Sequence, residues 1–248
     1  MNAHSLVLVT RTAPAGIALA ARVAEAGFES VHCAPFRLEG PANPAAKANE
    51  LRVCLPADRV ILTSQEAVRR AVELVGVEPF NRSLVIVPGR GTAEVAQQAG
   101  LKNVIYPDRH GTSEAMLGME ELREVDGLDV VILAAAGGRG LIGQVVERRG
   151  GTVERVHVYR RVPCALPDDL ETRIGRACAL VTLAASREAV DGLCRSLSPP
   201  ARGRVLGGTV IAPSERVLAH ARGLGFAHCL TAAGASDESM LRALARHA

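Results

Sequence analysis

The chain contains an internal repeat with a strand–turn–helix–strand pattern. Residues 7–27 (VLVTRTAPAGIALAARVAEAG) align with residues 130–150 (VVILAAAGGRGLIGQVVERRG) without a gap. In both copies an apolar run enters a turn, a helical segment follows, and a glycine (Gly27 or Gly150) ends the segment. A second β-type run then follows in each copy. This order is typical of parallel sheets, whose neighbouring strands need a crossover helix.

The repeat continues beyond this first unit. Three further pairs of segments match in the same order: 64–68 with 186–190, 85–88 with 210–213, and 113–117 with 237–241. The order of units is therefore a-b-c-d-a′-b′-c′-d′. We expect two similar α/β domains that face each other across a cleft. Whether unit a packs with b-c-d or with b′-c′-d′ stays open at this point.

Hydrophobic spacing and helix signals predict alternating strands and helices. The predicted strands are 6–10, 28–34, 60–63, 84–87, 104–105, 130–133, 153–159, 180–183, 209–212 and 227–230. The predicted helices are 15–26, 45–55, 65–75, 92–99, 114–122, 139–149, 170–177, 187–197, 214–223 and 238–247. Segments 35–44 and 164–167 are predicted linkers, and 198–208 a surface loop. Ser113 and Ser236 are predicted N-caps.

Composition restricts the function classes. Apolar residues make up 48% and charged residues 22% of the 248 residues, which is typical of a globular protein. With four Phe, two Tyr and no Trp, aromatic platforms for single-stranded nucleic acid are not expected. The net charge of +3 tolerates an anionic ligand but is too small and too evenly spread to indicate nucleic-acid binding.

Cysteine and histidine usage predicts a cytoplasmic protein without a metal site. The six cysteines are scattered and form no CxxC pair, which favours reduced, mostly buried thiols. The seven histidines show no metal-ligand spacing. No signal peptide is predicted, since residues 1–5 lead directly into a strand. No apolar run reaches the ~18 residues of a membrane span.

The turns after the predicted strands favour an anion-binding cleft. Each places a hydroxyl, a glycine or an arginine at a helix N-terminus, where unpaired N–H groups attract carboxylates or phosphates. These turns contain Ser64, Gly89 to Thr92, Gly138 with Arg139, Ser186, and Ser214. A single Ser N-cap is more often structural, but five such turns in two similar domains favour binding of an anion. In parallel sheets they lie at the carboxyl ends of the strands.

Other site signals are individually weak. Gly89 and Gly91 lack the third glycine of a dinucleotide fingerprint, and neither a P-loop nor a GxSxG motif is present. Arginines near the turns could simply be solvated; Arg11 and Arg139 are the better carboxylate-binding candidates, because a guanidinium binds a carboxylate bidentately. Tyr159 ends a strand, so its phenol either packs with a hydrated hydroxyl or points into the cleft.

The motifs together resemble the uroporphyrinogen-III synthase family over nearly the whole chain. The residues that carry the resemblance are LVTR (8–11), ILTS (61–64), GRGTA (89–93), GGR (137–139), VYRR (158–161) and LGF (224–226). The chain departs from the family pattern at Thr12, at Ala134 and Ala135, at Ala184 and Ala185, and at Glu215 and Arg216.

The resemblance implies two similar flavodoxin- or Rossmann-like parallel-sheet domains facing a cleft and joined by two extended linkers. The N-terminal domain is discontinuous in this family. It implies that domain 1 comprises residues 1–37 and 164–248, and domain 2 residues 40–161.

The resemblance also implies a cofactor-free lyase of haem biosynthesis. Such an enzyme cyclises hydroxymethylbilane, a linear tetrapyrrole with eight carboxylates, to uroporphyrinogen III, with inversion of ring D and loss of water. Tyr159 matches the tyrosine that assists loss of the hydroxyl. The expected substrate-binding residues are Arg11, Ser64, Gly89, Thr92, Gly138, Arg139, Ser186, Ser214 and Arg216.

Two hypotheses about function follow. The first is a monomeric cytoplasmic enzyme that uses no cofactor or metal, and that makes at most transient contact with the preceding pathway enzyme. The second is a non-catalytic two-domain protein that binds or senses a small molecule on the same scaffold. Neither hypothesis involves a nucleic acid or a membrane.

Overall fold

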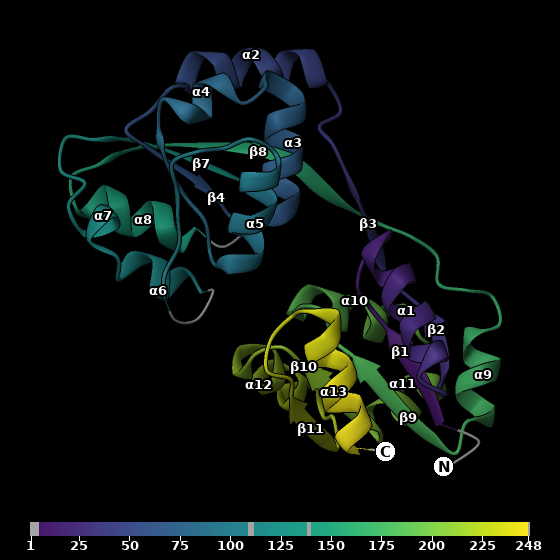
Figure 1. Cartoon of the computed structure of the whole chain (residues 1–248). Helices are drawn as coiled ribbons and strands as arrows, with labels where there is room; N and C mark the ends of the chain where they lie inside the picture. The colour runs from purple at the N-terminus through teal and green to yellow at the C-terminus, as the bar shows by residue number, and fades with distance from the viewer. Residues whose placement is uncertain (1–4, 109–111, 138–139, 248) are drawn as a thin grey trace. The chain divides into compact units, whose positions relative to one another are not determined.

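The computed structural model describes residues 5–108, 112–137 and 140–247 (Figure 1). The chain forms two compact units. Unit 1 consists of Met1–Arg37 and Val162–Ala248, and unit 2 consists of Leu38–Arg161. Unit 1 is therefore discontinuous in sequence: the chain leaves it after its first strand–helix–strand segment and returns after unit 2 is complete.

Unit 1 is built on a five-stranded sheet. Its order is β11 (His228–Thr231), β10 (Thr209–Ala212), β9 (Ala179–Leu183), β1 (Ser5–Val9) and β2 (Glu29–His32). All neighbouring strands are parallel. Counted from β2, the order is 2-1-3-4-5 along the unit's own strands, which is the flavodoxin-like order.

Unit 2 has the corresponding arrangement, circularly permuted along the chain, with one added strand. The sheet runs β3 (Phe36–Glu39), β8 (Thr152–Pro163), β7 (Asp129–Ala135), β4 (Arg59–Leu62), β5 (Leu84–Ile86) and β6 (Val104–Ile105). The strand pairs from β8 to β6 are parallel.

These pairings settle which parts of the internal repeat pack together. β1 lies beside β9, and β7 lies beside β4. The first unit of each copy therefore packs with the later units of the other copy, which the repeat alone left open. The predicted fold class, parallel α/β with two similar sheets, is confirmed.

Helices cover both faces of each sheet. Those of unit 1 are α1 (Ala15–Glu25), α9 (Leu170–Arg176), α10 (Arg187–Ser196), α11 (Pro199–Leu206), α12 (Glu215–Leu224) and α13 (Asp237–His247). Those of unit 2 are α2 (Pro44–Cys54), α3 (Gln65–Val75), α4 (Glu78–Asn81), α5 (Arg90–Gln98), α6 (Ser113–Leu117), α7 (Glu120–Arg123) and α8 (Leu141–Arg148). None of the helices in the described ranges is long and apolar enough to cross a membrane.

The central strands are apolar on both faces because helices cover both. In β1, Leu6 and Leu8 belong to one core cluster, whereas Val7 and Val9 belong to the cluster on the other face. All four side chains are fully buried. A continuous apolar run instead of an alternating one is the pattern of a parallel strand buried on both sides.

Three local predictions are wrong. Thr112, not Ser113, caps α6, since its Oγ1 accepts a hydrogen bond from the Ala115 N–H at 3.1 Å. The single helix predicted for 114–122 divides into α6 and α7. The predicted loop 198–208 contains helix α11, because Pro199 and Pro200 occupy first-turn positions where no backbone donor is needed.

The cysteines are less uniformly buried than the sequence predicts. All six are free thiols. Cys33 and Cys194 are buried, Cys178 is exposed, and the other three are intermediate.

Candidate functional site

The carboxyl edge of the unit 2 sheet brings together residues from four separate segments. Thr63 follows β4 and binds the end of β7: its backbone N–H and its Oγ1 both donate to the Leu133 carbonyl, at 3.1 and 3.0 Å. β4 and β7 are the pair at which the strand order reverses. Ligands of open α/β sheets bind outside the carboxyl ends at this point.

Ser64 and Tyr159 form a hydrogen-bonded pair at this edge. Ser64 is the N-cap of α3, as predicted, and its Oγ accepts from the Ala67 N–H at 3.1 Å. The same Oγ lies 3.0 Å from the Tyr159 Oη, and either hydroxyl can donate. Tyr159 comes from β8 and its side chain is only 6% exposed. The phenol therefore combines a buried ring with a hydroxyl held at a helix N-terminus.

The turn after β5 lies beside the Ser64 turn. Gln65 Nε2, at the start of α3, donates to the Gly91 carbonyl at the start of α5, at 3.1 Å. Gly89 is the N-cap of α5 and supplies no side chain to cap it. Thr92 lies in the first turn of α5 and is only 9% exposed. The structure thus brings Ser64 and the α5 turn together, as the sequence predicts, but largely buries Thr92.

Two predicted residues fall outside the described part of unit 2. Gly138 and Arg139 lie between residues 137 and 140, where the structure gives no account. The preceding segment is described: Ala135 ends β7, and the Ala136 N–H donates to the Tyr159 carbonyl at 3.0 Å.

Unit 1 repeats this arrangement at its own carboxyl edge. Thr10 Oγ1 donates to the Leu183 carbonyl at 3.0 Å and accepts from the Ala185 N–H at 3.1 Å. Ser186 caps α10 by accepting from the Ala189 N–H at 3.1 Å. Thr10 and Thr63 are not among the predicted site residues, although LVTR and ILTS each place one of these threonines at the end of a strand.

Ser214 and Ser186 are both N-cap residues, but only the Ser186 hydroxyl makes a capping hydrogen bond. Ser214 is the N-cap residue of α12, but its side chain makes no capping hydrogen bond. Arg216, in the first turn of the same helix, has an exposed side chain. The turn therefore offers a hydroxyl that the helix does not use for its cap.

Arg11 lies at the unit 1 edge, but it is bound within the protein. Its Nη1 forms an ion pair with Asp237 in the first turn of α13, and its Nη2 donates to the Ala235 carbonyl. Arg22 Nη1 lies 3.5 Å from the same carboxylate. Asp237 is not among the predicted site residues. The one local feature that marks it in the sequence is its place directly after the predicted N-cap Ser236, at the start of a helix.

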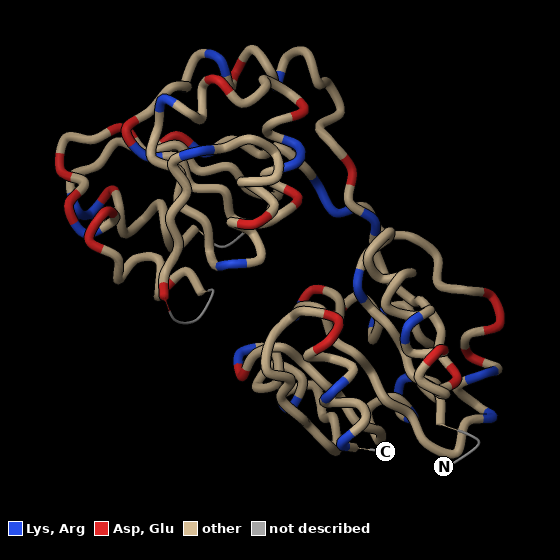
Figure 2. The backbone as a smooth tube through the Cα atoms, in the orientation of Figure 1, with Lys and Arg blue, Asp and Glu red and all other residues tan. Residues whose placement is uncertain are grey.

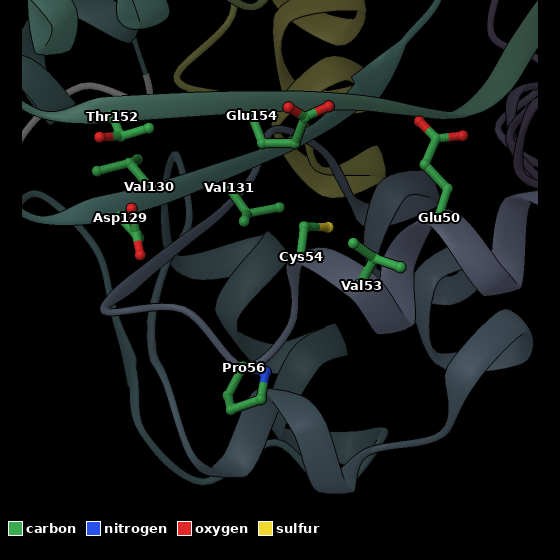
Figure 3. Close-up of a pocket in the computed structure, with 9 residues that line it drawn as sticks. All are labelled: Glu50, Val53, Cys54, Pro56, Asp129, Val130, Val131, Thr152 and Glu154. Carbon is green, nitrogen blue, oxygen red and sulfur yellow. The ribbon is translucent and has the colours of Figure 1, made fainter.

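A pocket of about 520 Å³ lies at the opposite edge of the unit 2 sheet, where β7 and β8 begin. Its lining includes Asp129 and Thr152, the first residues of these strands, together with Glu50 and Glu154. Figure 3 shows Asp129 and Glu50 toward opposite ends of the pocket, with Cys54 between them. Three carboxylates make this pocket unfavourable for an anionic ligand.

Among the residues that the structure describes, Lys and Arg are spread over many elements. Lys and Arg positions are interspersed with Asp and Glu along both units (Figure 2). An anionic ligand would therefore meet charges of both signs on each unit.

Strand order and site together define a class: two-unit α/β proteins with helix N-termini at the carboxyl edge of each parallel sheet. Comparison with known proteins narrows the class. The family model described as uroporphyrinogen-III synthase HemD matches residues 17–242. The chain therefore belongs to the uroporphyrinogen-III synthase family.

Curated relatives and solved structures agree with this assignment. The uroporphyrinogen-III synthase of Escherichia coli is 28% identical over 247 residues, covering 96% of this chain and 99% of the relative. That of Salmonella typhimurium is 27% identical over 245 residues, covering 96% and 99%. A mutant uroporphyrinogen III synthase from Thermus thermophilus is similar in fold, with a TM-score of 0.67, 18% identity and 98% coverage of both chains. The Helicobacter pylori uroporphyrinogen-III synthetase has a TM-score of 0.64, 13% identity and coverage of 99% and 100%.

Proposed function

We propose that this chain cyclises hydroxymethylbilane to uroporphyrinogen III, with inversion of ring D and loss of water. The observation that carries the proposal at the site is the hydrogen-bonded pair of Ser64 and the buried Tyr159 at the carboxyl edge of unit 2. Family membership supports the substrate and the reaction. We propose that the enzyme acts in the cytoplasm, as a monomer, with at most transient contact with the preceding pathway enzyme.

Tyr159 is the proposed proton donor. The hydroxyl of the substrate leaves as water when it receives a proton, and a phenol O–H at hydrogen-bond distance can supply that proton. Ring closure later releases a proton from the pyrrole carbon, so that the phenol is restored. Ser64 remains hydrogen-bonded to Tyr159 Oη through this cycle. The N-terminus of α3 favours the negative charge that develops on the phenol oxygen.

The remaining proposed contacts bind the eight carboxylates and fold the chain of the substrate. Backbone N–H groups at the starts of α5, α10 and α12 suit carboxylates, as do the hydroxyls of Ser186 and Ser214. Positioning matters here, because uncatalysed ring closure gives the isomer without inversion. Gly138, Arg139 and Arg216 are proposed to add further contacts, and Arg11 would do so only on release from Asp237.

The competing hypothesis is a protein that binds or senses a small molecule without catalysis. Freshly prepared hydroxymethylbilane, incubated with the protein and analysed by chromatography that separates the uroporphyrinogen isomers, distinguishes the two. We expect the type III isomer at a rate proportional to protein concentration. Type I product equal to the protein-free control would overturn the proposal.

A further inference from the structure

Strand β8 contains a half-buried arginine, Arg155, whose guanidinium makes no hydrogen bond or ion pair with the described residues. Arg155 is the register partner of Ile132 in β7. Val153, two residues earlier, packs against the core cluster that α8 covers, so strand alternation turns Arg155 to the same face. A guanidinium is always charged and has five N–H donors, and polar groups withdrawn from water normally have partners. Arg155 therefore has donors that an external anion can use.

The guanidinium of Arg155 lies against the first turn of α8. A Cβ built on Gly143 would be 3.0 Å from Arg155 Nη2, and a Cβ built on Gly140 would be 3.7 Å from Nη1. Because both residues are glycines, the two terminal nitrogens can lie directly beside the helix. This turn follows β7, so it lies at the carboxyl edge of the unit 2 sheet, where open α/β sheets bind ligands.

The turn at Gly140 combines several hydrogen-bond donors. The first N–H groups of a helix have no acceptor within it, and they form the positive end of the helix dipole. Gly140 supplies no side chain as a cap, and none of the described residues in the first turn of α8 is acidic. Gln144 Nε2 also reaches back to within 3.3 Å of the Cβ position of Gly140. A cation here is repelled by the helix dipole, so an anion bound at this turn would stabilise both Arg155 and the helix.

Arg149, at the other end of α8, shows the usual arrangement. It is the C-cap residue, and the dipole favours a cation at that end. Its Nη1 donates to the carbonyls of Leu117 and Leu122. Arg155 differs in both respects, because its donors are unused and it lies where the helix favours a negative charge.

We propose that Arg155 is a substrate-binding residue, whose guanidinium binds one carboxylate of the substrate at the first turn of α8. The inference rests on the proposed function for the identity of the ligand, but not for the binding of a carboxylate. The carboxylate accepts from the guanidinium and from backbone N–H groups of the turn. This contact holds the substrate beside the end of β7, where Ala135 is the register partner of Tyr159.

The first test removes the charge. Arg155→Gln should raise the KM for hydroxymethylbilane roughly tenfold, with kcat changed by less than about threefold, because the contact is the same in the ground state and the transition state. Arg148→Gln is the matched control. It removes one positive charge from an exposed position in the last turn of the same helix, and we expect the parental KM.

The second test moves the guanidinium and keeps the charge. In Gly143→Ala the added methyl group would lie 3.0 Å from Arg155 Nη2, so the flexible end of Arg155 must shift. Alanine is the better helix former, so the Tm should be equal or higher while KM rises as in Arg155→Gln. Gly203→Ala in α11 is the control, since a Cβ there meets no described atom within 4 Å. We expect a parental KM from it.

Chemical labelling tests the same contact without catalysis. Phenylglyoxal modifies accessible arginines, and peptide mass spectrometry locates the modified residues. Arg155 should react faster than Arg149, whose guanidinium is bound to carbonyls. Uroporphyrin III, a stable octacarboxylate, should slow the labelling of Arg155 about tenfold when present at about ten times its Kd. Sodium sulfate at the same ionic strength should protect Arg155 less.

The outcomes separate this inference from the proposed function. A parental KM in both Arg155→Gln and Gly143→Ala would overturn the role of Arg155. Equal protection by sulfate would mean that the turn binds any small anion, which would overturn the assignment to the substrate. If the parent protein makes no type III product, the proposed function fails, and protection by uroporphyrin III still tests carboxylate binding at Arg155.

Discussion

Arg11 and Asp237 are 226 positions apart in the sequence and form an ion pair in unit 1. The carboxylate also faces Arg22 at 3.5 Å, and the Arg11 guanidinium has a second acceptor in the Ala235 carbonyl. This cluster attaches the first strand–turn–helix segment of the chain to the last helix.

Replacing Asp237 by Asn should therefore destabilise unit 1. Both side chains are little more than one-fifth exposed, so the pair is only partly screened by solvent. We expect the free energy of unfolding in urea to fall by about 1 kcal/mol. Glu94→Gln removes the partner of the exposed Arg90 and is the matched control, with a much smaller expected change because solvent screens that pair. Equal effects of the two substitutions would contradict the assignment.

Tyr159→Phe should slow the reaction without abolishing it. The phenol is the proposed proton donor, and such donors contribute roughly 10²- to 10⁴-fold. We expect kcat to fall toward the lower end of that range, because positioning by the other groups remains. The product should still be mainly the type III isomer in single-turnover assays. A rate equal to that of the parent protein would show that Tyr159 has no chemical role.

Thr182→Val should stabilise the protein. Thr182 lies in β9 and is 1% exposed, and its Oγ1 has no hydrogen-bond partner among the described residues. An unsatisfied buried hydroxyl costs ~1–3 kcal/mol, so we expect a gain of about 1 kcal/mol in thermal or urea unfolding.

Thr10→Val is the matched control for Thr182. It removes a buried threonine hydroxyl in the neighbouring segment that has both an acceptor and a donor partner. This change should lower stability. A destabilised Thr182→Val variant would indicate a partner that the described contacts do not include.

Glu171 should contribute stability that depends on pH. Its carboxylate accepts from the Ser198 N–H at 2.7 Å and the Ser198 hydroxyl at 2.8 Å, ahead of α11. These bonds lower the pKa of Glu171. Because the folded-state pKa lies below the unfolded one, the contribution is complete above the unfolded pKa and is lost as pH falls through the folded pKa. The stability difference from Glu171→Gln should be constant near neutral pH and shrink below about pH 4. A difference that grows in acid would contradict this sign.

Cys33 and Cys178 should differ in reactivity. Burial raises the pKa of the Cys33 thiol to about 12, so at pH 8 it is almost entirely protonated as well as inaccessible. Cys178 is exposed. Brief iodoacetamide treatment followed by peptide mass spectrometry should label Cys178 and leave Cys33 unmodified until denaturant is added. Labelling of both in the folded protein would show that the unit 1 core opens readily.

Local sequence patterns determined much of this protein. Apolar runs, glycine stops and serine caps such as Ser64 and Ser186 depend on neighbouring residues, so they predict strands, helices and the turns between them. The internal repeat predicts two similar parallel sheets. Prediction failed where two local signals compete, as at Thr112 and Ser113, or where prolines begin a helix instead of a loop, as in α11.

Only the tertiary structure decided which units of the internal repeat pack together, where Tyr159 lies and what Arg11 binds. Each depends on contacts between residues far apart in the chain: β1 with β9, Ser64 with Tyr159, and Arg11 with Asp237. Strand alternation by itself would have placed Tyr159 on the other face of the sheet. The register of β8 against β7 shifts between His157 and Tyr159, so that Val158 and Tyr159 are both buried on the same side. Such a shift is a property of two paired strands and cannot be seen in either strand alone.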